Sequence, residues 1–569
     1  MSINSQKGFL GIDERKKLSD GLAFASNALN FRVNEAGGIE KRSGIAKVCT
    51  FFYAIEGIWS GMLNSEETVI IAAGGKLYSV LPNSKPFVPA LIGDIGLGEP
   101  MIFEFNGAIY IKTESDYFRY DGHTLSQVEG YIPCVAISCT SSGEGVSFEP
   151  INLLSEKRRQ LFSCDGSAIL YKLAESDIEE IVSVTVNGEK YTGNYSISEG
   201  NAVSFQAPPQ AGLNNMEITY KKPHASGMRE RILKCKRIML FGGNSNGRAF
   251  LWGNEDLPNY RFHSELADGV PSVEYFPVSA YTVIGNSKIT GIVQQYDKQL
   301  IFTKSEAYYS YSELITDALG NISASFPVYS LNASKGSIIE ADGCIIDNRP
   351  VTLCDDGLNM WESTSVENER NAICFSAPIK ETLKQILSAR GRTHIFDFQS
   401  RREMYLISDD TAIVYNYGNG CFYKHRGFGG NYYSVCGQTL YFANADTVYA
   451  FGELVDEKMT NGCRWESPFI DVGTQNGRCD ITECTADIFV NGATELRFDF
   501  EKSNGEIKTR RFSFPEGTDR FMRITFRPAL RRAMPFKLCI TESGSGKCVI
   551  HGISIKTRHK ERSNRFGLL

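Results

Sequence analysis

The stretch that decides the fold is residues 404–415, MYLISDDTAIVY. Residues 404–407 have the pattern of an apolar strand, 408–410 that of a tight polar turn, and 411–415 that of a second strand ending in tyrosine. Two short runs of β-branched and aromatic residues around turn residues predict an antiparallel hairpin. One hairpin cannot bury both of its faces alone, so we expect it to stack against other sheets.

The same unit recurs along the chain as an apolar strand, a tight turn and a tyrosine-bearing strand. Copies lie at 68–80, 108–120, 300–311 and 438–451. Repeats of four strands every 40–50 residues or so are typical of propeller blades. We expect blades near 52–82, 98–131, 230–262, 285–313, 335–362, 385–424 and 430–452. The predicted fold is therefore an all-β, six- or seven-bladed β-propeller, with an array of β-sandwiches as the alternative.

Two segments break this rhythm. The hairpin signal Asn187-Gly188 lies inside residues 177–223, which we predict to be a small β-sandwich module inserted in a loop between blades. A second Asn-Gly turn, Asn491-Gly492, lies among alternating strands in residues 456–569, which predict a C-terminal β-sandwich. The remaining parts are an N-terminal β segment or docking arm (1–48) and the two propeller parts (49–176 and 224–455). The best helix candidate is short, at residues 379–386.

Composition supports a globular, turn-rich β-protein. Of the 569 residues, 42% are hydrophobic and 22% charged, and there are 53 glycines. The formal net charge of −6 is small for this length, so it implies no general attraction to nucleic acid or to an anionic membrane. The polar N-terminus lacks a signal-peptide pattern, and no run is long enough for a membrane-spanning helix. Fifteen scattered cysteines predict reduced thiols in the core.

The sequence carries no convincing catalytic motif. It lacks a phosphate-binding Gly-x-x-x-x-Gly-Lys-Ser/Thr loop and a His-Glu-x-x-His zinc motif. Asp355-Asp356-Gly357 and residues 408–410 could offer oxygen ligands to calcium, but acidic turns explain them better. A pair of carboxylates for glycoside cleavage would meet only in the fold. We therefore predict no enzyme activity and no catalytic, cofactor-binding or metal-binding residues.

Residues 22–48 carry a resemblance to a known family. A small-residue segment leads to Asn30 and a short strand, followed by the Gly37-Gly38 turn and the basic pair Lys41-Arg42 before Gly44. This order resembles the opening of phage tail nozzle proteins of the tail tubular protein B type, with Ser43 where proline is usual. A second string, within residues 242–277, loosely resembles propeller-bearing phage proteins of the nozzle and DNA-stabilisation type.

The resemblance implies a virion structural protein, made in the host cytoplasm and located in the phage tail. It implies a ring of identical subunits, commonly a hexamer, around a channel for double-stranded DNA. Such a subunit retains packaged DNA, conducts it during ejection without sequence specificity, and contacts portal or adaptor proteins and tail fibres or spikes. The alternatives are a carbohydrate-binding or glycan-cleaving propeller at a tail tip, and a monomeric cellular scaffold propeller.

Basic residues cluster near the C-terminus, in residues 527–532 and 556–562. Lysine and arginine can neutralise phosphates, but no aromatic residues are interleaved here and the chain as a whole is acidic. We therefore expect these residues to be solvated or to lie at interfaces between subunits, rather than to contact DNA. We expect the N-terminal segment and the C-terminal sandwich to dock neighbouring subunits or rings. The interface candidates are Lys41, Arg42, Arg531, Arg532, Arg558, Lys560 and Arg562. For Lys41 and Arg42 we expect contacts between subunits or contacts that close the propeller, rather than a grip on DNA.

Overall fold

The computed structural model describes residues 2–19, 21–82, 87–198, 201–242, 247–316, 322–340, 344–362, 371–388, 392–452, 462–471, 478–531 and 535–560. It is all-β, as predicted. Within those residues the α-helices are α1 (Glu230–Leu233) and α2 (Lys380–Leu387), and the 3-10 turns are η2 (Ala377–Ile379) and η3 (Gln399–Arg401). The predicted short helix at 379–386 is confirmed as α2. The chain divides into two compact units, Met1–Gly74 with Tyr78–Ala90 and Asn332–Leu569, and Gly75–Leu77 with Leu91–Leu331.

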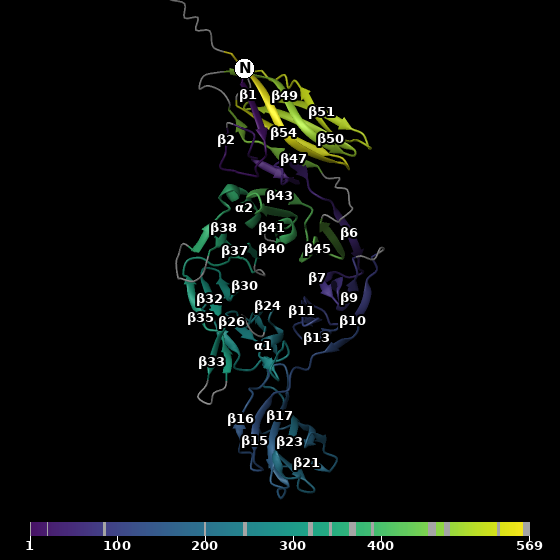
Figure 1. Cartoon of the computed structure of the whole chain (residues 1–569), viewed down its shortest axis with the longest axis vertical. Coiled ribbons are helices and arrows are strands. Elements are labelled where there is room, and N and C mark those ends of the chain that lie inside the picture. Colours follow the sequence, from purple (N-terminus) through teal and green to yellow (C-terminus); the bar gives the residue numbers. More distant parts are fainter. Residues whose placement is uncertain are drawn as a thin grey trace, which may run out of the picture. The chain divides into compact units, whose positions relative to one another are not determined.

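Runs of four paired strands follow one another along the chain (Figure 1). The first two sheets are β7 (Ile55–Leu63), β8 (Glu66–Ala73), β9 (Lys76–Val80) and β10 (Ala90–Asp94), and β11 (Met101–Phe105), β12 (Ala108–Lys112), β13 (Tyr117–Tyr120) and β14 (Leu125–Gln127). The next two are β24 (Arg237–Phe241), β25 (Arg248–Trp252), β26 (Tyr260–His263) and β29 (Tyr281–Val283), and β30 (Ile289–Gln295), β31 (Lys298–Thr303), β32 (Ala307–Tyr311) and β35 (Val328–Asn332).

Three more runs complete the series. They are β36 (Cys344–Ile346), β37 (Arg349–Cys354), β38 (Gly357–Trp361) and β39 (Ala372–Cys374); β40 (Thr393–Phe398), β41 (Glu403–Ser408), β42 (Thr411–Asn416) and β43 (Cys421–Arg426); and β44 (Tyr432–Cys436), β45 (Thr439–Asn444), β46 (Thr447–Gly452) and β6 (Ile45–Thr50). The β40–β43 run belongs to a larger sheet. Two small hairpins lie outside these runs, β27 (Leu266–Ala267) with β28 (Val270–Pro271) and β33 (Glu313–Thr316) with β34 (Ile322–Ser325).

The tight turns explain why these strands form hairpins. Asn106-Gly107 joins β11 to β12 with φ of 49° and 77°, and Asp347-Asn348 joins β36 to β37 with φ of 47° and 60°. Two successive left-handed residues give a turn whose twist matches that of paired strands, and Asn, Asp and Gly tolerate that conformation best. The second strand of a run is covered on both faces, so all of β41, for example, is buried.

The strand that precedes the first run completes the last one. β6 pairs antiparallel with β46, from Ile45 opposite Phe451 to Thr50 opposite Thr447. The β44–β46 sheet also packs against β7 and β8, since Val69 and Ile71 share a core with Tyr441 and Val448. The Ser60 amide donates to the Ser434 hydroxyl at 2.8 Å. Strands β6, β7 and β8 therefore form one packed region with residues 432–452.

The inserted module begins earlier than the predicted boundary at residue 177. One sheet contains β16 (Val146–Ser147), β15 (Cys134–Cys139), β17 (Lys157–Cys164), β23 (Gly212–Lys221), β19 (Glu180–Val186) and β20 (Glu189–Lys190), and the other β18 (Leu170–Lys172), β22 (Ala202–Phe205) and β21 (Tyr195–Ser198). β15 pairs parallel with β17, a pairing that needs no hairpin turn and leaves no turn signal. Between them, Leu153 and Leu154 return to the core that β11–β13 share with β24–β26.

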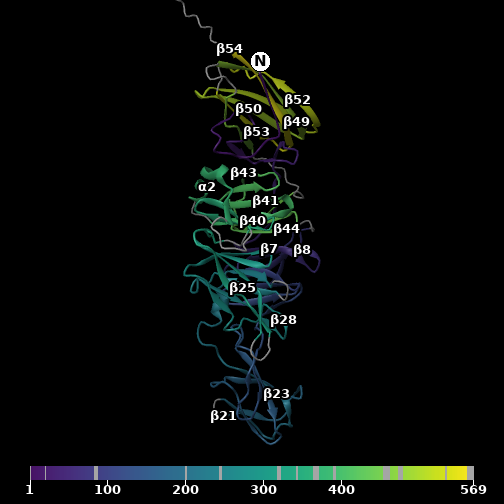
Figure 2. The same ribbon diagram turned by 60° about the vertical axis from the view of Figure 1, so that its left-hand side comes forward.

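The C-terminal sheets are built from both ends of the chain (Figures 1 and 2). One joins β4 (Phe31–Val33), β5 (Ile39–Lys41), β54 (Lys547–Lys560), β49 (Arg478–Asn491) and β52 (Asp519–Phe526), and β1 (Ser2–Lys7) also pairs with β54. The other links β2 (Leu18–Ser19), β48 (Phe469–Ile470), β53 (Phe536–Ser543), β47 (Cys463–Glu466) and β3 (Asn27–Leu29) to the β40–β43 run, with β50 (Thr494–Lys502) and β51 (Ile507–Phe514) beside β53. The segment predicted as a docking arm is therefore paired within its own chain.

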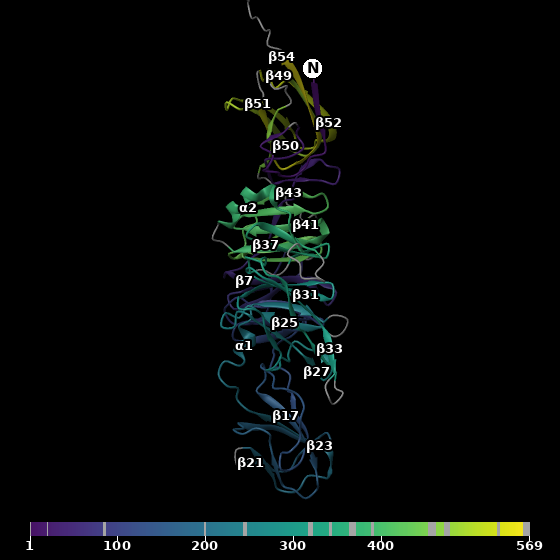
Figure 3. The ribbon, with the colours of Figure 1, turned by 90° about the vertical axis from the view of Figure 1, so that its left-hand side faces the viewer.

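The N-terminal segment also caps a helix of this unit. The Glu14 carboxylate accepts the Glu381 amide at 2.7 Å and the Thr382 amide at 3.0 Å at the start of α2, which lies beside β43 (Figure 3). The first amides of a helix have no partner within it, and a carboxylate there also meets the positive end of the helix dipole. The contact fixes residue 14 against residues far along the chain.

Candidate functional site

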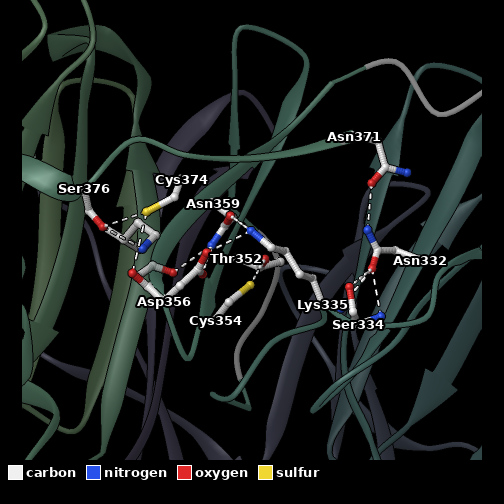
Figure 4. A network of polar contacts seen from close by, with 12 residues as sticks. Asn332, Ser334, Lys335, Thr352, Cys354, Asp356, Asn359, Asn371, Cys374 and Ser376 are labelled. Carbon is white, nitrogen blue, oxygen red and sulfur yellow. Dashed lines mark hydrogen bonds and ion pairs between the residues drawn. The ribbon is translucent and has the colours of Figure 1, made fainter. Parts of the chain in front are cut away.

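A connected polar network lies where the loop after β35 meets the turn between β37 and β38 (Figure 4). Its central members are Lys335, Asp356 and Asn359. Thr352 of β37 lies opposite Asn359 of β38, and its hydroxyl accepts a hydrogen bond from the Trp361 indole at 2.9 Å. Polar groups this well connected inside a sheet are held in one arrangement, which is what reactive or binding groups require.

Asn332 positions the loop that carries Lys335. Its side-chain oxygen accepts the amides of Ser334 and Lys335, both at 2.9 Å, and its side-chain nitrogen donates to Asn371 at 3.0 Å. Asn332 is 1% exposed, so these bonds form away from water. When an asparagine side chain accepts hydrogen bonds from the amides of the second and third residues after it, the backbone is held in a local turn. Lys335 therefore leaves the loop in a defined direction.

Three side chains then meet at hydrogen-bond distance. The Lys335 Nζ donates to Asp356 Oδ2 and to Asn359 Oδ1, both at 2.8 Å. Asn359 Nδ2 donates to Asp356 Oδ1 at 2.7 Å and to the Gly357 carbonyl at 3.0 Å. Asn359 is fully buried, whereas the side chains of Lys335 and Asp356 are 25% and 48% exposed. One carboxylate thus bridges an amine and a buried amide that also contact each other.

Electrostatics keep the bridging carboxylate ionised. Burial raises the pKa of Asp356, but hydrogen bonds from Lys335 and Asn359 and the charge of Lys335 outweigh this, so the pKa lies below its usual value. An ionised carboxylate can accept a proton, and an amine next to an amide carbonyl is a potential nucleophile. The chemistry available to this network is therefore proton transfer and attack by an amine.

The turn that holds Asp356 has little room to change. Gly357 has a φ of +132°, and a Cβ there would clash with the Ser376 hydroxyl. The same hydroxyl accepts the Leu358 amide at 2.8 Å. Cys374 lies beside it, with its thiol 3.6 Å from the Asp356 carbonyl (Figure 4). These contacts support the turn on which Asp356 and Asn359 stand three residues apart.

The turn Asp355-Asp356-Gly357 was considered above as a source of calcium ligands. In the structure, both carboxylate oxygens of Asp356 accept hydrogen bonds instead, one from Lys335 and one from Asn359. Among the residues that the structure describes, no group of three or more His, Cys, Asp or Glu is placed to hold a metal ion. The described cysteines are free thiols and most are buried, as predicted.

Lys41 and Arg42 lie inside the chain. Lys41 is 4% exposed, and its Nζ donates to the carbonyls of Gly544 and Gly546 at 2.6 and 3.3 Å. Arg42 is equally buried; it donates to Asn30 Oδ1 and to the carbonyls of Ser43 and Arg426, and burial lowers its pKa to about 10. Their partners are residues of the same chain, so we do not propose contacts between subunits for these two residues.

Arg531 and Arg558 are exposed and lie at the same end of β49. β49 pairs Asp480 with Arg558, and an antiparallel bridge joins Ile481 to Leu530, which places Arg531 on the other side of Asp480. Residues 456–569 contain 20 Lys and Arg against 15 Asp and Glu, whereas the whole chain has 60 against 66. Lys560 is described in its backbone only, and Arg532 and Arg562 lie outside the described residues.

Asp397, near the end of β40, has a carboxyl group with a shifted pKa. It lies close to Asp347, which follows β36, and the sequence analysis singled out neither residue. Burial raises the pKa of Asp397 to about 6, the hydrogen bond from the Tyr417 hydroxyl (3.1 Å) opposes the rise, and the charge of Asp347 adds to it. Asp397 is half-buried and Asp347 is exposed. Only the fold brings these two carboxylates into each other's field, so the sequence held no signal for them.

The fold places this chain among all-β proteins built from successive four-stranded sheets. No protein-family description matches it, and no curated protein matches it. Among solved structures it is similar to PorZ, an essential bacterial surface component of the type-IX secretion system of Porphyromonas gingivalis, with a TM-score of 0.33 and 11% identity. The match covers 82% of this chain and 46% of PorZ, so the chain spans less than half of that protein. Of the helices in the described ranges, none is long and apolar enough to cross a membrane.

Proposed function

We propose that the runs of four strands are the blades of one seven-bladed β-propeller, closed by the pairing of β6 with β46. That pairing carries the proposal, because a strand from before the first run completes the last one. A sheet that contains strands from both ends of a repeat series joins the first blade to the last, which is the usual way to close such a ring. Cryo-electron microscopy of the purified chain tests this, and a closed ring of seven sheets is the expected result.

On this basis we propose that the chain is a virion structural protein, a subunit of a phage tail nozzle. The support is the propeller proposal together with the resemblance of residues 22–48 to nozzle proteins. The subunit would join a homo-oligomeric ring, here a hexamer, below portal or adaptor proteins and beside tail fibres or spikes. Double-stranded DNA would be retained in the lumen and would pass through it during ejection.

Native mass spectrometry and negative-stain microscopy of the concentrated chain test this role. We expect closed rings with an open centre. The exposed arginines offer a sharper version: Arg531→Glu with Arg558→Glu should weaken ring formation, whereas Lys304→Glu, an exposed site on another sheet, should not. A chain that stays monomeric at every concentration and in the presence of virion partners would contradict the proposal.

A tail-tip propeller that binds or cleaves glycans is the second candidate, favoured by two observations. Tyr309, Tyr311 and Tyr329 stack with ring centroids 5.3 to 6.3 Å apart, and Tyr329 is 39% exposed. Asp397 has the raised pKa that a general acid needs, with Asp347 nearby. Release of reducing ends from host glycans, abolished in Asp397→Asn and retained in Glu495→Gln, would favour this function over the structural one.

A further inference from the structure

We propose that Lys335 and Asn359 join in an intramolecular amide bond, with Asp356 as the proton carrier. The proposal does not depend on the function proposed above. It rests on the three contacts of 2.7 to 2.8 Å that link amine, amide and carboxylate pairwise (Figure 4). The amine lies against the amide that it would attack, and each carboxylate oxygen faces one of the two nitrogens whose protons must move.

The reaction balances without an external reagent. Asp356 Oδ2 takes a proton from the Lys335 ammonium, and the free amine attacks Asn359 Cγ, so that a C–N bond forms. The Cγ–Nδ2 bond then breaks, and two protons follow the departing nitrogen. Asp356 Oδ1, which already shares a hydrogen bond with this nitrogen, returns the first proton. The attacking nitrogen, which carries one proton too many after its attack, releases the second through the same carboxylate, so that the nitrogen leaves as ammonium. The ammonium and amide become a secondary amide and one ammonium ion. No atom is oxidised or reduced.

The surroundings favour this reaction over a static ion pair. Asn359 is buried in the middle of β38 with both amide hydrogens and its oxygen engaged, so its carbonyl carbon is held in place. Asn332 fixes the loop of Lys335, and Ser376 supports the turn of Asp356. Holding reactants in near-attack geometry replaces an unfavourable encounter by an internal step. Asp356 itself is a poorer electrophile than Asn359, because an ionised carboxylate resists attack by an amine.

The bond would tie the loop after β35 to the third strand of its neighbouring run. Lys335 precedes β36 and Asn359 lies in β38, so the link closes a loop around β36 and β37. A covalent loop limits the unfolded chain as a disulfide does, and it is insensitive to reductants. A chain with reduced cysteines would gain a permanent cross-link in this way.

Intact-mass spectrometry of the denatured full-length chain tests the proposal, both fresh and after incubation at alkaline pH. We expect a mass lower than that of the sequence by one ammonia molecule, and a tryptic peptide in which Lys335 is linked to Asn359 and left uncleaved. The loss should be absent in Lys335→Arg, Asn359→Ala and Asp356→Asn. It should persist in Lys304→Arg, which removes an exposed lysine outside the network.

Two outcomes would overturn the proposal. One is a wild-type mass equal to that of the sequence after prolonged alkaline incubation of folded protein. The other is loss of water with Lys335 linked to Asp356, which would assign a different electrophile. Because masses are read after denaturation, a variant that folds poorly still reports whether the bond formed. Circular dichroism of Lys335→Arg, which keeps the positive charge, then separates loss of the bond from loss of the fold.

Discussion

The small module of residues 134–221 and the sheets at the two ends of the chain are both made of paired β-sheets, yet they assemble differently. The module takes all of its strands from one stretch, around a core that includes Phe162, Tyr171 and Met216. In the end sheets, β54 pairs with β1 and β5, and Lys41 binds the carbonyl of Gly544, 503 residues away. Similar sheets can therefore arise from local or from very distant pairing.

The difference has an energetic consequence. Closing a long loop costs only slightly more entropy than closing a short one, so burial of apolar side chains can offset the cost of pairing distant strands. Such pairing couples the two chain ends, because β1 and β5 both pair with β54. Disturbance of the end sheets should spread across both termini, whereas disturbance of the module should stay local.

The largest effect is expected from removing a buried phenylalanine in each region. Phe31→Ala and Phe162→Ala, at 1% and 0% exposure, should each lower the free energy of unfolding by about 3–5 kcal/mol. Hydrogen exchange should rise at both chain ends in Phe31→Ala, and only within residues 134–221 in Phe162→Ala. If the rise in hydrogen exchange in Phe31→Ala were confined to residues 27–41, the two chain ends would not be coupled as expected.

A pH-dependent effect is expected at Glu542 in the end sheets. Burial raises its pKa to about 8, against opposition from the charge of Lys41 and the amide of Cys548. The native state then keeps a proton that the unfolded chain releases near pH 4.5. The stability that Glu542 contributes is thus fully present below pH 4.5 and is lost as the pH rises through about 8.

Glu542→Gln should remove this loss. At roughly pH 9 the free energy of unfolding of the variant should exceed that of wild type by about 3 kcal/mol. This is less than the full pKa shift would give at roughly 1.4 kcal/mol per pKa unit, because the site can relax. Denaturant unfolding across pH measures it, with exposed Glu495→Gln on the neighbouring strand as the control. Parallel pH profiles for wild type and Glu542→Gln would contradict the assignment.

Lys41→Met should cost about 2 kcal/mol, because two carbonyls of the β53–β54 turn lose a charged donor. Arg531→Ala, at an exposed site, should change stability by no more than about 0.5 kcal/mol. Thermal unfolding compares the two. Equal effects would mean that the buried pairing of the chain ends contributes no more than a surface contact.

The smallest effect is expected at the base of the module. The Tyr131 hydroxyl lies 3.0 Å from a Glu149 carboxylate oxygen and 2.9 Å from one of Asp268, either of which can accept its single hydrogen, and it accepts from Arg159 of β17 at 2.9 Å. Tyr131→Phe should cost about 1 kcal/mol and raise hydrogen exchange at residues 131–134 and 266–271 only. Tyr195→Phe inside the module is the matched control, and an equal response in both variants would argue against a tether at Tyr131.

Hairpins were predictable from the sequence because their signals are local. Residues 404–407 and 411–415 form the paired strands β41 and β42, and 438–443 and 446–451 form β45 and β46. The sheets of the module also contain β15 to β18, which precede the predicted boundary at 177; the parallel pairing of β15 with β17 needs no hairpin turn. The candidate site was harder to predict. Asp356 was noticed as part of an acidic turn, but Lys335 lies 21 residues earlier in the chain, and Asn359, three residues after Asp356, belongs to no motif.

The sequence by itself determined that this protein is all-β, where its hairpins turn and that most of its described cysteines are buried, because alternation, β-branching and turn chemistry act between near neighbours. Only the tertiary structure decided that Lys41 and Arg42 are buried, that the N-terminal strands complete the C-terminal sheets, and that Lys335, Asp356 and Asn359 meet. Pairing between distant segments depends on the sum of many weak apolar contacts and on backbone hydrogen bonds common to all residues, so no short motif encodes it.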